Sequence, residues 1–301
     1  MGRLNLQEKL ADPASPDRRP RRVAYALPAL LTAGNAFLGF LSIVKAFQGA
    51  LFAMEGHLGS NPHFEVAAKS IGIAVLLDGL DGRIARMTNT TSEFGKEMDS
   101  LADVITFGVA PAVLALAWGV QFVDGSMPAL VRDYLRRSGY WVAFLFLLCG
   151  AVRLARFNVQ KNPVPKNPGR PERKYFVGLP IPAAAAMVAA VVYAADCAPI
   201  EYWPLSVAWL GLVALLSFLM VSTWRYRSFK DIQLLRPQSP LTVIVWGGLF
   251  YLIWNFSHPV LLAMATAYVG SGVVVRMGGI LRRRLRPAPP VVEAGVAKHG
   301  D

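Results

Sequence analysis

Eight long apolar runs, separated by short polar stretches, constrain this 301-residue chain more than any other feature. The runs cover residues 24–48, 64–88, 98–120, 139–160, 178–197, 203–224, 240–256 and 258–280. Each is about 20 residues long, which is the length that an α-helix needs to cross the hydrocarbon core of a bilayer. A soluble domain of this size would carry more charge than the 17% found here. The sequence therefore predicts an all-α, polytopic membrane helix bundle of about eight transmembrane helices.

The two ends of the chain differ in composition from the middle. Residues 1–22 are polar and rich in proline and arginine, and they predict a disordered basic arm on the cytoplasmic side. Residues 287–301 begin with several prolines and predict a disordered tail. Residues 23–286 then form one transmembrane domain, which we expect to consist of a six-helix core and two further helices.

The cations of the chain lie mainly between the apolar runs. A net charge of +12 would suggest nucleic acid as a partner for a soluble protein, but here it indicates membrane topology and attraction to anionic lipid headgroups. Basic segments at 1–22, 161–177, 225–239 and 282–286 alternate with loops at 49–63, 198–202 and around 258 that hold no lysine or arginine. This alternation predicts both termini in the cytoplasm. Residues 121–138 oppose the pattern, because this loop should lie outside yet holds Arg132, Arg136 and Arg137.

Four aspartates lie in or beside the second and third apolar runs, at Asp78, Asp81, Asp99 and Asp103. Ionisable side chains inside a membrane are costly and therefore indicate a functional site. Asp99 and Asp103 are one helical turn apart and share a face. The short link between the two runs makes their helices antiparallel neighbours, so the two aspartate pairs can converge near the cytoplasmic end.

The face that carries Asp78 and Asp81 also carries Gly82, Ala85 and Arg86. At roughly 100° per residue, these five positions fall within an arc of about 140°. Small residues beside a charged site allow a bulky ligand to approach the backbone. An arginine on the same face can bind phosphate through two parallel hydrogen bonds.

Four converging carboxylates repel one another unless they are protonated or neutralised by cations. An all-oxygen cluster favours hard divalent ions, so we expect two divalent cations, Mg²⁺ or Mn²⁺. Paired ions of this kind suit in-line phosphoryl chemistry. A divalent-cation transporter is the alternative from another class of protein. The arginine on the aspartate face and the position of the site near one membrane surface, away from the midplane, favour the phosphoryl chemistry.

These residues form the pattern D-x-x-D-G-x-x-A-R-x8-G-x3-D-x3-D over residues 78–103. The pattern resembles the signature of the CDP-alcohol phosphotransferase family, and all eight fixed positions are filled. The resemblance implies a metal-dependent enzyme of phospholipid biosynthesis. It implies that Asp78, Asp81 and Asp99 hold one metal ion, and that Asp78, Asp99 and Asp103 hold the second. Asp103 is further implied to be the base that takes the proton of the acceptor hydroxyl.

The resemblance also implies which residues bind the CDP-lipid. Four of them match positions in or near the signature, namely Gly82, Ala85, Arg86 and Ser92. In the first helix, residues 28–32 resemble the nucleotide-binding segment of the family, although Ala29 stands where asparagine is usual. Thr32 and Asn35 are therefore candidates for the nucleotide pocket. The alternative for both is that they are polar residues that pair membrane helices.

The acceptor alcohol is indicated by other segments. Residues 91–111, 150–158 and 176–184 resemble the phosphatidylserine synthase branch of the family in its integral membrane form. Arg153 and Arg156 lie near the cytoplasmic end of the fourth helix and suit the carboxylate of serine. The alternative is that both arginines extend to the lipid headgroups. Glycerol 3-phosphate or inositol phosphate would also require cations, so charge alone leaves those acceptors open.

Together, these resemblances imply that the chain transfers a phosphatidyl group from CDP-diacylglycerol to L-serine, giving phosphatidylserine and CMP. They imply a homodimer in the cell (inner) membrane with its active site facing the cytoplasm. We expect membrane lipids and the two substrates as partners, and no nucleic acid.

Overall fold

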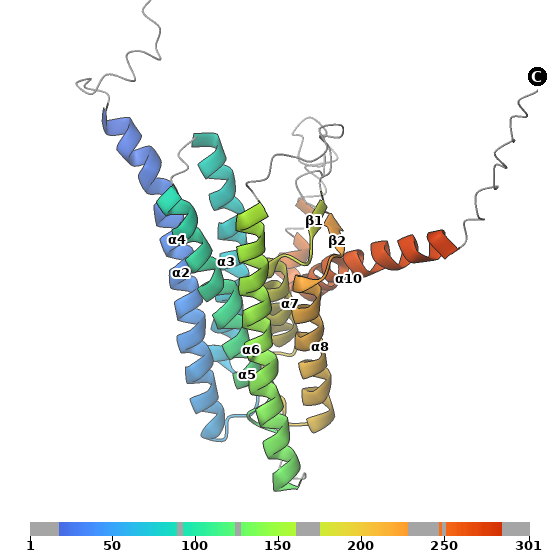
Figure 1. The fold of residues 1–301 in the computed structure, drawn as a ribbon. Helices are drawn as coiled ribbons and strands as arrows, with labels where there is room; N and C mark the ends of the chain where they lie inside the picture. Colours follow the sequence, from blue (N-terminus) through green and yellow to red (C-terminus); the bar gives the residue numbers. More distant parts are fainter. Residues whose placement is uncertain are drawn as a thin grey trace, which may run out of the picture.

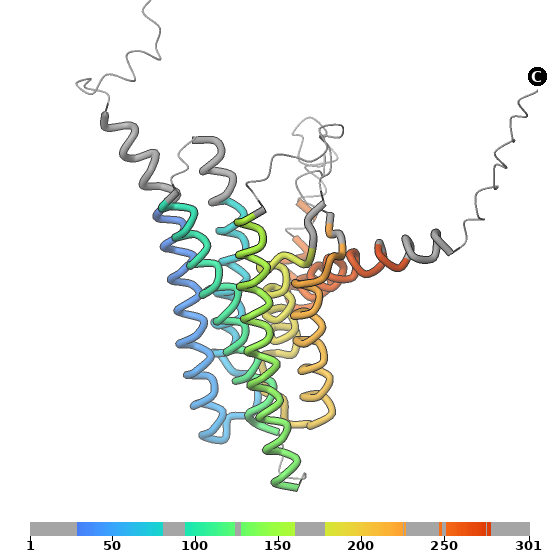
Figure 2. Tube along the Cα trace, viewed as in Figure 1, coloured from blue at the N-terminus to red at the C-terminus, as the bar shows by residue number. Residues whose placement is uncertain are grey.

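The computed structural model describes residues 18–88, 93–123, 128–160, 175–227, 247–248 and 251–284. They form a bundle in which most of the long helices run side by side (Figure 1). In chain order the elements are α2 (Arg18–Met54), α3 (Pro62–Thr88), α4 (Glu93–Asp103), the π-helix η1 (Val104–Val109), α5 (Ala110–Gly119), α6 (Ala129–Gln160), β1 (Tyr175–Val177), α7 (Ile181–Ala194), α8 (Trp203–Val221), β2 (Arg225–Arg227) and α10 (Ser257–Arg284). The predicted all-α architecture is confirmed, with one short two-stranded sheet added. The part of α10 drawn in orange to red runs sideways out of the bundle (Figure 2).

Five helical stretches in the described part of the chain are long and apolar enough to cross a membrane. They are Ala29–Met54, Phe94–Gly119, Ala129–Val159, Trp203–Val221 and Ser257–Val274. A shorter apolar helix, Ile181–Ala194, lies among them. α3 is 27 residues long and packs along α2, but it carries several charged residues. The chain is thus a multi-pass membrane protein. About half of the predicted seventh run, residues 240–256, lies outside the described residues.

Two predicted boundaries differ from the structure. α2 begins at Arg18, so the last five residues of the predicted arm, 18–22, are helical, whereas residues 1–17 lie outside the described part. α6 begins at Ala129, ten residues before the predicted run. The arginines that opposed the charge pattern therefore lie on a helix, and Arg136 donates a hydrogen bond from Nη2 to the carbonyl of Gln121 at 3.0 Å. The charge rule counts Arg136 as a topology signal, but this hydrogen bond gives the residue a structural role.

The inner and outer faces of the bundle carry different side chains. Where α2 and α3 meet, several of the buried residues are small, as at Ala46 and Ala67. The outward faces carry large apolar side chains such as Phe37, Phe47 and Trp141, which are exposed in the isolated chain. This arrangement is typical of membrane helices, in which small residues allow close packing and large ones face lipid.

Polar side chains connect the helices at a few buried points. Ser42 Oγ donates to the carbonyl of Ala67 at 3.0 Å and ties α2 to α3. Asn61 is fully buried and donates from Nδ2 to the carbonyl of Gly49 at 2.9 Å. Its Oδ1 accepts from the backbone N–H of His63 at 3.0 Å, as an N-cap residue does at the start of α3. These contacts fix the hairpin that delivers the aspartates of α3.

The loops predicted at 161–177 and 225–239 contribute a small antiparallel sheet that the sequence did not indicate. Phe176 pairs with Tyr226 at its centre. The next residue after β1, Gly178, has φ of +82°, and a Cβ there would lie 2.4 Å from the carbonyl oxygen of Met220. Only glycine fits this close approach without strain. The sheet places Tyr226 in the core of the bundle, where it is fully buried.

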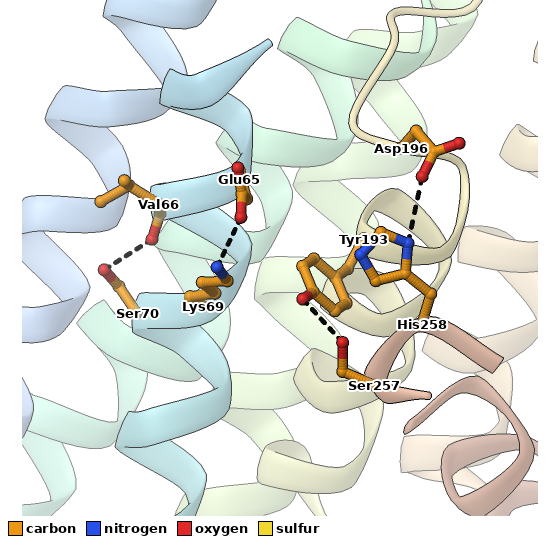
Figure 3. Close-up of polar contacts among 8 residues, drawn as sticks. All are labelled: Glu65, Val66, Lys69, Ser70, Tyr193, Asp196, Ser257 and His258. Atoms are coloured by element: carbon orange, nitrogen blue, oxygen red, sulfur yellow. Dashed lines mark hydrogen bonds and ion pairs between the residues drawn. The ribbon is translucent and has the colours of Figure 1, made fainter. Parts of the chain in front are cut away.

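A polar cluster joins α3, α7 and α10 at the end of the bundle remote from the aspartates of α3 (Figure 3). Tyr193 Oη and Ser257 Oγ are 3.0 Å apart, and His258 Nδ1 lies 3.0 Å from Asp196 Oδ1. The ammonium of Lys69 lies 5.5 Å from the centre of the Tyr193 ring. These contacts attach the start of α10 to the end of α7.

Candidate metal centre

Three of the four predicted metal ligands converge. Asp78 of α3 and Asp99 and Asp103 of α4 each offer a carboxylate oxygen, and these atoms all lie within 4.8 Å of one another. Asp103 is buried and the other two are half-buried. Asp81 lies three residues after Asp78 on the helical backbone of α3, but its side chain is outside the described part. The predicted convergence therefore holds for every member that can be placed.

The donor set fits a divalent cation. Three carboxylates this close repel one another strongly when all are ionised. All the donors are hard oxygen atoms, which suit Mg²⁺ or Mn²⁺ better than softer metals. Asp78, Asp99 and Asp103 are also the set that the family resemblance assigns to one of its two ions. The structure thus supports a site for at least one such ion.

The helix that carries Asp103 changes its geometry directly after this residue. The sequence predicts a single helix over 98–120, and that prediction is wrong in detail. α4 ends at Asp103, η1 follows with π-helical geometry over Val104–Val109, and α5 continues from Ala110. Wider π turns inside helices occur frequently at functional sites. Here the π turn lies beside the most buried carboxylate of the cluster.

Gly39 on α2 allows η1 to lie this close. A Cβ on Gly39 would be 2.7 Å from Thr106 Cα and 2.5 Å from Thr106 Oγ1. Thr106 is fully buried, and its hydroxyl donates to the carbonyl of Asn35 at 2.9 Å. The contact therefore involves backbone that cannot move without shifting η1.

Gly39→Ala is expected to destabilise the protein and to reduce any activity of the aspartate site, because η1 must move away from α2. Overpacking of this kind typically costs about 1–3 kcal/mol. The midpoint of thermal unfolding in detergent should fall by several degrees. The matched control is Gly34→Ala on the same helix, because a Cβ there meets nothing within 4 Å. Alanine favours helix over glycine, so this control should be neutral or stabilising. Equal melting of the two variants would contradict the role given to Gly39.

The structure separates the two predicted acceptor arginines. Arg153 of α6 is half-buried and interacts electrostatically with Asp103 and with Tyr268 of α10. Its Nε is buried and has no hydrogen-bond partner among the described residues. Arg156, one turn further along α6, is exposed. Arg153 is therefore the arginine that lies beside the carboxylate cluster.

Asn158 is a residue of the site that reasoning from the sequence did not single out. It lies on α6 and donates from Nδ2 to Ser100 Oγ of α4 at 2.8 Å. Ser100 in turn donates to the carbonyl of Lys96 at 2.9 Å. Because Ser100 follows Asp99 directly, this contact ties α6 to the turn that presents the carboxylate. Asn158 lies in the segment 150–158, whose resemblance pointed to the acceptor. The sequence therefore indicated this segment, but not the hydrogen bond that Asn158 makes.

The predicted nucleotide residues of α2 are both buried. Thr32 and Asn35 lie one turn apart, and the Asn35 carbonyl accepts the hydrogen bond from η1 described above. In the part of the chain that can be placed, Asn35 Oδ1 has no hydrogen-bond partner. A buried amide oxygen without a partner requires an explanation, and a ligand is one. The packing alternative accounts for the backbone of Asn35 but not for its side chain.

The other CDP-lipid candidates fall wholly or partly outside the described residues. Gly82, Ala85 and Arg86 lie on the helical backbone of α3, with side chains outside the described part. Ser92 lies wholly outside the described residues. Their assignment rests on position in the signature.

Comparison with known proteins agrees with the geometry. Residues 25–221 match the family model described as CDP-alcohol phosphatidyltransferase. A CDP-diacylglycerol–serine O-phosphatidyltransferase from Helicobacter pylori is 38% identical over 215 residues, which cover 71% of this chain and 77% of that protein. The enzyme of the same name from Saccharomyces cerevisiae is 38% identical over 165 residues, covering 54% of this chain and 52% of its own. An archaetidylserine synthase from Methanothermobacter thermautotrophicus is 36% identical over 203 residues, covering 67% and 69%.

Proposed function

The chain belongs to the CDP-alcohol phosphatidyltransferase family, and from this premise we propose that it transfers a phosphatidyl group from CDP-diacylglycerol to L-serine, giving phosphatidylserine and CMP. The serine acceptor is supported by the names of relatives from a bacterium and a yeast that align at 38% identity. The archaeal relative also carries serine in its name. Arg153, beside the carboxylate cluster, is the observation in the structure that best suits an acceptor with a carboxylate.

Asp78, Asp99 and Asp103 would hold a divalent cation, Mg²⁺ or Mn²⁺, and Asp81 would join Asp78 and Asp99 in holding a second. When bound, such ions neutralise charge on the diphosphate and on the CMP leaving group. Gly82, Ala85, Arg86 and Ser92 would hold the CDP moiety, together with Thr32 and Asn35.

The residues of the chain then have distinct roles in the transfer. Arg153 binds the carboxylate of serine and brings its hydroxyl toward Asp103, which accepts the hydroxyl proton. The serine oxygen forms a bond to the lipid-side phosphorus, and the bond from that phosphorus to the bridging oxygen of CMP breaks. CMP departs with the bonding electron pair. The contribution of the protein is mainly to position the groups and to stabilise charge.

We further propose that the enzyme lies in the cell (inner) membrane and that its active site faces the cytoplasm. Residues 23–286 would form the transmembrane domain, with 1–22 and 287–301 as disordered ends. The alternating basic loops support this orientation. A homodimer is proposed from the family resemblance.

The proposal predicts that purified protein releases CMP from radiolabelled CDP-diacylglycerol only when serine and Mg²⁺ or Mn²⁺ are both present. Glycerol 3-phosphate and inositol phosphate serve as competing acceptors in the same assay. Addition of EDTA should abolish turnover, and restored metal should recover it. Release with another acceptor but not with serine would overturn the choice of acceptor. If no acceptor supports release in the presence of lipid and metal, the enzyme assignment fails and cation transport by the same aspartates becomes the better account.

A further inference from the structure

Two tyrosines from outside the family-model match pack against each other near the acceptor site, and one of them, Tyr268, interacts electrostatically with Arg153. The match ends at residue 221. Tyr226 lies on β2, and Tyr268 lies on α10. Both elements fold back onto the bundle, with β2 pairing to β1 and α10 packing against α7 and β2.

Arg153 connects the tyrosines to one of the metal ligands. It interacts electrostatically with both Asp103 and Tyr268. The rings of Tyr268 and Tyr226 have centres 6.0 Å apart and planes inclined at 40°. Gly272, one turn after Tyr268 on α10, makes room for this ring, since a Cβ there would lie 2.2 Å from Tyr226 Cε1. The packing of α10 thus sets the position of both tyrosines.

The hydroxyl of Tyr226 is not explained by packing. Tyr226 is fully buried, and its hydroxyl has no hydrogen-bond partner within the described ranges. Burial without a partner is unfavourable for a hydroxyl, so phenylalanine would serve better if the ring only filled space. Burial also raises the pKa of Tyr226, which keeps the hydroxyl protonated and able to donate.

Like the Tyr226 hydroxyl, Arg153 Nε is a buried donor without a hydrogen-bond partner among the residues that can be placed. Two such buried donors, both associated with Tyr268, suit an anionic group with several acceptor oxygens. The contacts in Figure 3 attach the start of α10 to α7 at Ser257, which is 11 residues before Tyr268. α10 is thereby held at both ends of this stretch, by Ser257 and His258 before Tyr268 and by Gly272 after it.

We propose that Tyr226 and Tyr268 complete the acceptor site of this enzyme: Tyr268 is a positioning residue for Arg153, and the Tyr226 hydroxyl donates a hydrogen bond to the acceptor's carboxylate. This inference rests on the proposed serine transfer. It makes the elements after residue 221 contribute to selection of the acceptor together with Arg153, while the matched family domain supplies the aspartates.

The test measures the steady-state kinetics of Tyr226→Phe and Tyr268→Phe in the full-length protein. Tyr226→Phe should raise the KM for serine roughly tenfold or more, as expected when a hydrogen bond to a charged group is lost. The kcat and the KM for CDP-diacylglycerol should change less than about twofold, and the Tm should stay level or rise because an unpaired buried hydroxyl is removed. Tyr268→Phe should raise the serine KM severalfold. The matched control is Tyr140→Phe, which removes an exposed tyrosine hydroxyl on α6 that takes no part in holding α10 and should leave every constant unchanged.

Two results would overturn the inference. The first is a serine KM of wild-type value in both variants. The second is a joint fall of Tm and kcat in Tyr226→Phe without a change in the serine KM, which would make the hydroxyl structural. Failure of the proposed function gives a different result, because wild-type protein would then release no CMP with serine. In that case the variants are scored with the acceptor that supports release, and an unchanged KM for that acceptor overturns the role of the tyrosines.

Discussion

Asp103→Asn is expected to reduce turnover by at least about a thousandfold, because one substitution removes a general base and a metal ligand together. The asparagine side chain keeps the shape of the aspartate, so the packing beside η1 is preserved. Loss of one negative charge from three carboxylates whose oxygens lie within 4.8 Å also relieves repulsion. The unfolding midpoint without metal should therefore stay level or rise. CMP release from CDP-diacylglycerol measures the first effect, and a thermal melt measures the second.

A second readout separates ion binding from chemistry. An ion that binds only the folded protein raises its Tm in proportion to the logarithm of the ion concentration above the dissociation constant. Added Mn²⁺ should raise the Tm of the wild type and raise that of Asp103→Asn much less. The matched control is Asp196→Asn, which alters an exposed aspartate at the remote end of the bundle and should leave both turnover and the Mn²⁺ effect intact. Turnover within tenfold of wild type would remove Asp103 as the base.

The sequence predicts the aspartate cluster because the constraint is local. Asp99 and Asp103 are one turn apart, and a short link brings their helix against the helix of Asp78, so convergence follows from helical geometry alone. The apolar runs are equally predictable, since a bilayer demands a minimum length of apolar helix. Both features depend on residues that are near one another in the chain.

The features that the sequence did not predict depend on contacts between distant segments. The π turn after Asp103 requires Gly39, more than sixty residues earlier, to leave space for Thr106. Tyr226 meets Tyr268, and Tyr268 comes near Arg153, only because a two-stranded sheet and the packing of α10 bring them there. Neither the short strands nor a lone tyrosine in an apolar helix carries a recognisable pattern. The sequence also does not separate Arg153 from Arg156. The structure does, because Arg153 is half-buried and Arg156 is exposed.

Arg153→Ala is expected to raise the KM for serine by roughly a hundredfold, with a much smaller effect on the KM for CDP-diacylglycerol. The guanidinium is half-buried beside Asp103, where a charge-assisted hydrogen bond to a carboxylate contributes about 1.5–3 kcal/mol. A factor of one hundred corresponds to about 2.8 kcal/mol, which lies within that range. Removal of the arginine also takes a cation away from Asp103, so kcat should fall as well.

Arg156→Ala provides the matched control, because it removes the same side chain one turn along the same helix. Arg156 is exposed, and exposed cations contribute little because water and salt screen them. The KM of Arg156→Ala for serine should therefore stay within a few-fold of the wild-type value. Equal effects of the two variants on serine would contradict the assignment of Arg153 alone. A larger effect of Arg153→Ala on CDP-diacylglycerol than on serine would place its guanidinium at the diphosphate, and the carboxylate of the acceptor would then need a different partner.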